Sequence, residues 1–176
     1  MQIIDTHIHL YDFGKGDLGQ PGMSSAGYGK SLYHGEERRI APPSFRDCVS
    51  SVKLLLEYMD WCHVEKGIIL SNPYYGYFNE YITEAVKKYP ERLKGVALVD
   101  VLKGKTAADE LEKIYRDSVL FGMAFETENT FFEKPYMRLS DPLIEPVWQC
   151  MDAWKQPAFL HMFTEADVED VEILSE

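Results

Sequence analysis

Five short segments of this chain are almost continuously apolar and rich in branched or aromatic side chains. Each is bounded by polar or turn-forming residues, and each is too short for a buried helix. They are predicted to be strands and cover residues 2–10, 66–70, 94–100, 120–126 and 157–163.

Four other segments repeat apolar residues at steps of three and four, which is the spacing of a helix with one buried face. The first predicted helix is capped by Ser44 and ends near Cys62. In the last one, residues 144–154, Pro146 is tolerated only in the first turn. The remaining two cover residues 78–88 and 106–118.

The alternation of strands and helices indicates parallel β-α units, because strands that are apolar throughout are covered on both faces. A doubly wound sheet and a barrel both satisfy this pattern. The one G-x-G-x-x-G match, residues 14–19, follows the first predicted strand but opens no predicted helix, and no G-x-x-x-x-G-K-[ST] motif follows a predicted strand, which weakens the nucleotide-binding sheet. The pattern therefore favours an α/β barrel built as one domain over residues 1–176.

Residues 11–43 interrupt this alternation. They contain many glycines and the pair Pro42-Pro43, and they show no sustained helical spacing. Structureless loops of this length inside a compact domain are usually functional or disordered. We expect a long loop over the presumed active-site face.

The composition narrows the class of ligand. The formal net charge is -11, from 29 acidic and 18 basic residues, and it repels phosphate backbones and anionic membranes. We therefore expect a small molecule or a metal ion, and neither nucleic acid nor a membrane. The absence of a membrane-spanning or signal-type segment predicts a cytoplasmic location. Cys48, Cys62 and Cys150 form no C-x-x-C pair and are interpreted as reduced, structural thiols.

The first predicted strand contains the stretch DTHIHLY. Side chains two apart on a strand share a face, so Asp5, His7 and His9 project together, and His9 lies near the carboxyl end of the strand. In a parallel barrel this end carries the active site. His161 lies near the carboxyl end of the fifth strand. The pattern favours a divalent-metal site of His7, His9 and His161 over hydrogen-bonded structural histidines.

Weaker candidates lie at strand ends and in loops. Glu126, at the end of the fourth strand, either contacts metal or substrate or is a solvated carboxylate. Tyr74 and Tyr75, after the second strand, either form a wall of the pocket or simply pack. Arg38 either pairs with a substrate carboxylate or belongs to a solvated basic cluster. Four further residues of these groups have the same alternatives: Tyr77, Lys15, His34 and Arg39.

Two features receive no chemical role. Trp61, Trp148 and Trp154 sit at helical spacings and are predicted to lie in the core. The acidic residues 164–176 are predicted to form a solvated loop or the start of a helix.

The stretch DTHIHLY resembles the first-strand signature of the amidohydrolase superfamily. The resemblance is specifically to the amidohydrolase-2 family of metal-dependent hydrolases and decarboxylases related to aminocarboxymuconate semialdehyde decarboxylase. LLEYMDWCHVEKGIIL and NEYITEAVKKYPERLKGVALVD are similar to helix-and-strand segments of that family, and LSDPLIEPVWQCMDAWKQPAFLHMF resembles the segment leading to its fifth-strand histidine. The similarity spans nearly the whole chain.

This resemblance implies a TIM-type (β/α)8 barrel in which His7, His9 and His161 bind a metal ion, usually zinc. It also implies a further histidine after the sixth strand and an aspartate at the end of the eighth, which binds the ion and handles the proton of its water. A complete barrel takes about 250 residues, whereas this chain reaches Glu176 just after the fifth strand. We therefore expect a barrel truncated after that strand, with open sheet edges that a homo-oligomer could cover.

Three functions are compatible with these expectations. The first is a metal-dependent hydrolase that acts on a small carboxylate, lactone or amide substrate through a metal-activated water. The second is a metal-dependent decarboxylase of the same family, and the residues do not choose between these two. The third belongs to another class, a non-catalytic truncated barrel that binds a partner or self-associates through its open edges.

Overall fold

The computed structural model describes residues 2–12, 24–33, 35–73, 75–126, 138–162 and 164–175. The contacts within the chain divide it into two compact units, residues 1–95 and 96–176. Strand β8 (Leu93–Ala97) begins in unit 1 and ends in unit 2. The prediction of one domain over the whole chain stays a prediction.

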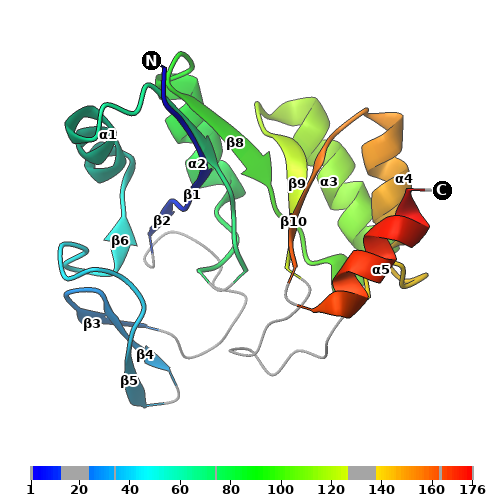
Figure 1. Ribbon diagram of the computed structural model, residues 1–176, viewed down its shortest axis with the longest axis horizontal. Coiled ribbons are helices and arrows are strands. Elements are labelled where there is room, and N and C mark those ends of the chain that lie inside the picture. Colours follow the sequence, from blue (N-terminus) through cyan, green and yellow to red (C-terminus); the bar gives the residue numbers. More distant parts are fainter. Residues whose placement is uncertain are drawn as a thin grey trace. The chain divides into compact units, whose positions relative to one another are not determined.

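Unit 1 is built on parallel strands (Figure 1). Strand β1 (Ile4–Ile8) pairs with β7 (Lys66–Ile69), and β7 pairs with the first residues of β8. Helices α1 (Val52–Trp61) and α2 (Asn79–Lys88) follow β1 and β7 in the chain. Apolar side chains of these elements form the core, among them Ile8, Met59, Ile69, Ile82, Val86 and Leu93.

Unit 2 continues the same pattern. The end of β8 pairs in parallel with β9 (Phe121–Glu126), and β9 pairs with β10 (Ala158–His161). The strand order is therefore β1-β7-β8-β9-β10, and the predicted parallel β-α arrangement is confirmed. The helical segments of unit 2 are η1 (Val101–Lys103), α3 (Lys105–Asp117), α4 (Glu145–Ala153) and α5 (Glu165–Leu174).

Helices α3 and α4 pack against each other in unit 2 (Figure 1). Ala107, Leu111 and Tyr115 recur along α3 at steps of four and are buried, which is why this segment forms a helix with one apolar face. Pro146 lies in the first turn of α4, as predicted. There its missing N–H leaves no hydrogen bond unmade.

The predicted start of the first helix is wrong. Ser51, and not Ser44, caps α1, and its hydroxyl accepts a hydrogen bond of 3.2 Å from the Leu54 N–H. The preceding residues cannot be helical, because Cys48 has φ +53° and strand β6 (Val49–Ser50) is paired with β2 (Tyr11–Asp12).

The prediction of a loop over residues 11–43 is also wrong for the part that the structure describes. Besides β2, this part contains a three-stranded antiparallel sheet of β3 (Ser24–Gly27), β4 (Lys30–Tyr33) and β5 (Glu36–Arg39) (Figure 1). The three strands read SSAG, KSLY and EERR, and the side chains of β5 are all exposed, so no alternation of apolar and polar residues marks them. Backbone pairing and tight turns hold the sheet together.

Gly29, in the turn between β3 and β4, joins this sheet to the segment that follows β5. Its N–H donates to the Phe45 carbonyl at 2.7 Å, and its own carbonyl accepts from the N–H groups of Ile40 and Ala41 at 2.9 and 3.0 Å. Gly29 has φ +75°, and a Cβ atom here would collide with the Ala41 and Pro42 carbonyl oxygens. Only glycine satisfies both the backbone conformation and this close approach.

The acidic residues 164–175 take the second of the two predicted forms, the start of a helix. They form α5, which begins with a capping box: the Thr164 N–H donates to the Asp167 carboxylate at 2.8 Å, and the Thr164 hydroxyl accepts from the Asp167 N–H. Asp167 and Asp170 are both fully buried. The prediction of a solvated segment is therefore wrong at these two positions.

Asp170 anchors α5 to the segment before α4. One oxygen accepts from Arg138 Nε at 2.9 Å and from the Ser140 hydroxyl at 2.6 Å, and the other accepts from the Leu139 N–H at 2.7 Å. Burial alone raises the pKa of this carboxyl group, but the hydrogen bonds and the Arg138 charge outweigh it and hold the pKa below its usual value.

The tryptophan prediction fails for Trp61, which is 76% exposed, and for Trp154, which is 38% exposed. Trp148 is partly buried: it stacks on Phe125 with ring centroids 4.3 Å apart, and its Nε1 donates to the Leu139 carbonyl at 2.8 Å. Helical spacing correctly places these tryptophans on or at the ends of helices α1 and α4. It does not predict which helix ends are covered by other side chains.

Two other predictions concern the cysteines and the absence of a membrane-spanning segment. Cys48, Cys62 and Cys150 are free thiols. None of the helices in the described part of the chain has the length and hydropathy of a membrane-crossing segment.

Replacing Asp170 by asparagine should lower the free energy of unfolding by about 2–3 kcal/mol near neutral pH, because the amide has one acceptor oxygen in place of two and lacks the charge that pairs with Arg138. Since folding lowers this pKa, the stabilisation is complete above the unfolded-state pKa and is lost as the pH falls through the folded-state pKa. The difference between wild type and variant should therefore shrink in acid. Urea unfolding across pH measures it, with Asp152→Asn as the control, because the Asp152 side chain is 84% exposed.

Replacing Gly29 by alanine should destabilise unit 1 by more than about 2 kcal/mol. The conformational strain of alanine at a positive φ and the collision of its Cβ with backbone oxygens both destabilise the folded variant. Gly35→Ala is the matched control, because Gly35 has φ +83° but no atom lies within 4 Å of its Cβ position. It should cost only about 1 kcal/mol. Equal losses in urea unfolding would mean that the contact with Ala41 and Pro42 has no energetic role.

Candidate metal site

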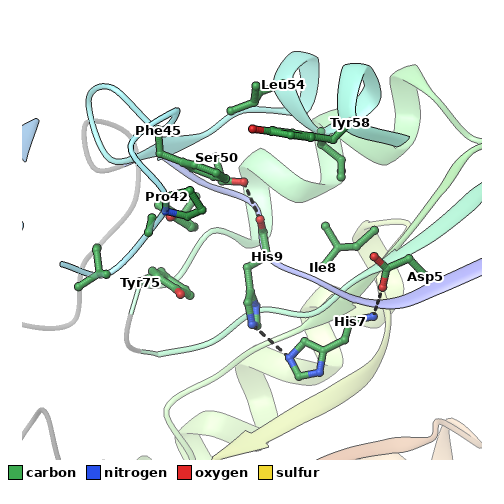
Figure 2. A pocket seen from close by; sticks show the side chains of 14 residues that line it. Asp5, His7, Ile8, His9, Pro42, Phe45, Ser50, Leu54, Tyr58 and Tyr75 are labelled. Carbon is green, nitrogen blue, oxygen red and sulfur yellow. Dashed lines mark hydrogen bonds between the residues drawn. The ribbon is translucent and has the colours of Figure 1, made fainter. Parts of the chain in front are cut away.

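A cavity of about 290 Å³ opens in unit 1 beside the carboxyl end of β1 (Figure 2). Its polar end is formed by Asp5, His7 and His9, so these three side chains share one site, as their spacing predicted. The rest of its wall is largely apolar and aromatic and comes from the segment after β5, from α1 and from the loop after β7. These residues include Pro42, Phe45, Leu54, Leu55, Tyr58 and Tyr75.

The two imidazoles meet through their outer nitrogens. His7 Nε2 and His9 Nε2 lie 3.2 Å apart, and the ring planes are nearly perpendicular, at 86° (Figure 2). Two nitrogen ligands at 2.0–2.1 Å from one ion in tetrahedral geometry are about 3.3–3.4 Å apart. The separation therefore fits two ligands of a single ion.

His9 is oriented by a backbone carbonyl. Its Nδ1 lies 2.9 Å from the oxygen of Leu70, the residue that follows β7. A carbonyl only accepts, so Nδ1 carries the proton and the neutral ring has its lone pair on Nε2. This is the tautomer that a ligand binding through Nε2 needs, and a second hydrogen bond of this kind is common behind metal-binding histidines.

The backbone around the pair is also held by side chains. Asp5 accepts a hydrogen bond of 3.0 Å from the His7 N–H (Figure 2). The Ser50 hydroxyl donates to the His9 carbonyl at 2.8 Å, which ties β6 to the residue after β1. In the neutral pair His7 Nε2–H donates to His9 Nε2, so joint binding of an ion requires the His7 proton to sit on Nδ1.

His161 lies in unit 2, where it is paired with Glu126. The two residues occupy matching positions at the ends of β10 and β9, and His161 Nδ1 lies 2.8 Å from a Glu126 carboxylate oxygen. The Glu126 side chain is 10% exposed, whereas that of His161 is 48% exposed. An ionised carboxylate only accepts, so the proton of neutral His161 sits on Nδ1 and its lone pair on Nε2.

Among the described residues, no group of three or more His, Cys, Asp or Glu side chains lies close enough together to hold a metal ion. The close pair His7–His9 belongs to unit 1 and His161 to unit 2. The three-histidine ligand set therefore stays a prediction.

The weaker candidates are distributed unevenly. Tyr75 lines the cavity and packs beside His9, with ring centroids 5.3 Å apart. Arg38 pairs with Glu36 at 2.9 Å on exposed strand β5 and does not line this cavity. Tyr74 lies outside the described residues, as do Lys15 and His34. Substrate contacts of all these residues stay predictions.

Three elements of the site were not expected from the sequence. Ser50 and the Leu70 carbonyl reach His9 only through tertiary pairing, which no local pattern reveals. Tyr11 did have a signal, because the spacing of two that selects Asp5, His7 and His9 extends to it. Tyr11 is 3% exposed and also lines the cavity.

Among known proteins, only solved structures show a similarity to this chain. No family model matches the chain, and no curated protein matches it. Among solved structures it is similar to a probable 2-pyrone-4,6-dicarboxylic acid hydrolase from Acinetobacter baumannii with citric acid bound, at a TM-score of 0.65 and 19% identity. This match covers 100% of the chain and 55% of the other protein.

Two further structures have the same relation to the chain. An amidohydrolase II has a TM-score of 0.61 and 18% identity, over 99% of this chain and 56% of the other. A mutant 5-carboxyvanillate decarboxylase from Novosphingobium aromaticivorans, with bound manganese and 3-methoxy-4-hydroxy-5-nitrobenzoic acid, has a TM-score of 0.62 and 15% identity, over 99% and 54%.

These similarities confirm the resemblance at the level of the fold. The strand order and the matches agree with a TIM-type barrel represented through its fifth strand. The chain spans about half the length of each solved structure. It therefore has the fold of the amidohydrolase-2 proteins to which its sequence shows a resemblance.

Proposed function

We propose that the chain carries part of the metal site of a metal-dependent hydrolase, with His7, His9 and His161 as ligands. One observation carries this proposal: the two Nε2 atoms at the end of β1 lie 3.2 Å apart, and His9 is held by Leu70 in the tautomer that binds through Nε2. A pair of hydrogen-bonded structural histidines is the alternative, and the zinc-binding experiment below separates the two.

A divalent ion held by these residues would supply a Lewis acid and would lower the pKa of water, so that hydroxide would be available near neutral pH to attack a carbonyl group. The chain's own residues orient the ligands: Leu70 and Ser50 fix His9, and Glu126 fixes His161. We propose zinc, because imidazole nitrogens and a near-tetrahedral spacing suit it. Manganese is the alternative, since one of the similar structures contains it.

The substrate of the proposed hydrolase is a small organic carboxylate, lactone or amide. A cavity of about 290 Å³ is of the size that small ligands occupy. Its polar end lies at the histidines and its apolar end against Pro42, Phe45 and Leu54, so a flat molecule with one polar end suits it (Figure 2).

Decarboxylation is the second candidate reaction. Aromatic side chains line the cavity, namely Tyr11, Phe45, Tyr58 and Tyr75, and one similar structure is a decarboxylase that holds an aromatic acid. The same histidines would then orient the carboxylate that leaves as carbon dioxide. Carbon dioxide release from a hydroxybenzoate, compared with opening of a pyrone lactone, separates the two reactions. The homo-oligomer and the cytoplasmic location stay predictions.

The double variant His7→Ala/His9→Ala should lose bound zinc, with an affinity more than about 100-fold weaker than that of the wild type, because two of the proposed ligands are removed. Equilibrium dialysis followed by elemental analysis measures this. The control is His63→Asn, since His63 is exposed at the end of α1 and has φ +57°, which asparagine tolerates. Zinc content that is unchanged by the double substitution would exclude the proposed site and favour a non-catalytic binding module.

Glu126→Ala should weaken zinc binding by about 10–100-fold, as expected for loss of a group that orients a ligand. His161→Ala should have the larger effect, because it removes the proposed ligand itself. The same dialysis measures both variants. If Glu126→Ala has the larger effect, Glu126 and not His161 binds the ion.

A further inference from the structure

The ring of Tyr75 is part of a column of aromatic side chains that ends at the proposed metal site. Tyr75 stacks on Tyr11, with ring centroids 4.2 Å apart and planes within 2° of each other. On the side of His9 its centroid lies 5.3 Å from the imidazole, at an angle of 49°. His9 in turn meets His7 edge to face, and Figure 2 shows Tyr75 beside His9 in the cavity.

From this contact we propose that Tyr75 is a positioning residue for His9, and that Tyr11 is the brace that holds Tyr75 in place. The role of the contact in metal binding rests on the proposed function, whereas its role in orienting the ring does not. This positioning role differs from the substrate contact expected from the sequence, because Tyr75 orients His9 before any substrate is present.

An imidazole needs such support because rotation about its Cβ–Cγ bond is soft. A half-turn exchanges Nδ1 with a ring carbon and takes Nε2 away from the Nε2 of His7. The hydrogen bonds that join the ring to Leu70 and to His7 oppose this rotation, but each is a modest constraint. A flat ring packed against the imidazole adds a steric barrier and gains contact energy only in one orientation.

Tyr11 is held in place by burial and by backbone pairing. Tyr11 is 3% exposed and belongs to β2, where its backbone pairs with Ser50 of β6. Ser50 also donates its hydroxyl hydrogen bond to the His9 carbonyl. The short β2–β6 pair therefore holds both the Tyr11 ring, which stacks on Tyr75, and the backbone of His9. The same pair of strands thus positions both residues of the Tyr75–His9 contact.

Tyr75 itself is held at its backbone. Its N–H donates to the Asn72 carbonyl at 3.0 Å, in the turn that follows β7. Leu70 lies at the beginning of the same connection, directly after β7. The segment after β7 thus reaches His9 twice, through the Leu70 carbonyl at Nδ1 and through the Tyr75 ring.

Histidine-ring NMR on the ¹⁵N-labelled full chain, treated with chelator, tests the orientation without any metal. Wild type and Tyr75→Phe, which keeps the ring, should show His9 with its proton on Nδ1. Tyr75→Ala should show a mixture of the Nδ1–H and Nε2–H forms. Tyr89→Ala, the same change at the end of α2, is the control and should match wild type. If Tyr75→Ala does not fold, Tyr75→Leu replaces it, because leucine fills space without a flat ring.

Zinc affinity, measured on the same proteins by competition with a chelating dye, is the second readout. Tyr75→Ala should bind about 10-fold more weakly, and Tyr75→Phe should stay within about 2-fold of wild type. A pure Nδ1–H tautomer for His9 in Tyr75→Ala would overturn the proposal, and so would an equal effect of Tyr75→Phe. A tautomer mixture in Tyr75→Ala together with a wild type that binds no zinc would support the positioning role and overturn the proposed metal function.

Discussion

The hydrogen bond from His9 Nδ1 to the Leu70 carbonyl depends on the parallel pairing of β1 with β7, and the candidate site depends on that bond. Parallel strands end on the same side of the sheet, so the residue after β7 comes beside the residue after β1. The Leu70 N–H donates to the Ile8 carbonyl at 2.8 Å, which sets this register. The chemistry of His9 is therefore a consequence of backbone pairing.

In unit 2 a side-chain carboxylate, in place of a backbone carbonyl, accepts the hydrogen bond from a histidine Nδ1. Glu126 and His161 occupy matching positions on paired strands, so the carboxylate reaches Nδ1 without a long side chain having to be ordered. In both units an acceptor on Nδ1 places the proton of the neutral ring there and leaves the lone pair on Nε2. The buried carboxylate of Asp170, held by Arg138, Ser140 and the Leu139 N–H, contributes only to stability, because it anchors α5.

Sequence patterns predicted the five parallel strands and the histidine pair because both depend on local spacing. They misplaced the helix cap at Ser44 because the pairing of β6 with β2, which makes Ser51 the cap, joins distant residues. The sheet of β3, β4 and β5 was missed because its strands, SSAG, KSLY and EERR, carry neither an apolar run nor an alternation of apolar and polar residues. Nor could the spacing of acidic residues show that Asp170 meets Arg138 in a buried position, or that a backbone oxygen orients His9.

The proposed metal site requires His7 and His9 to bind one ion through their Nε2 atoms. X-ray absorption at the zinc edge, recorded on the zinc-loaded full chain, examines this directly. Binding by this pair predicts at least two imidazole nitrogens at about 2.0–2.1 Å from the zinc, and two fewer in the His7→Ala/His9→Ala variant. A first shell of oxygen atoms alone in the wild type, or an unchanged number of imidazole nitrogens in that variant, would exclude binding by the pair.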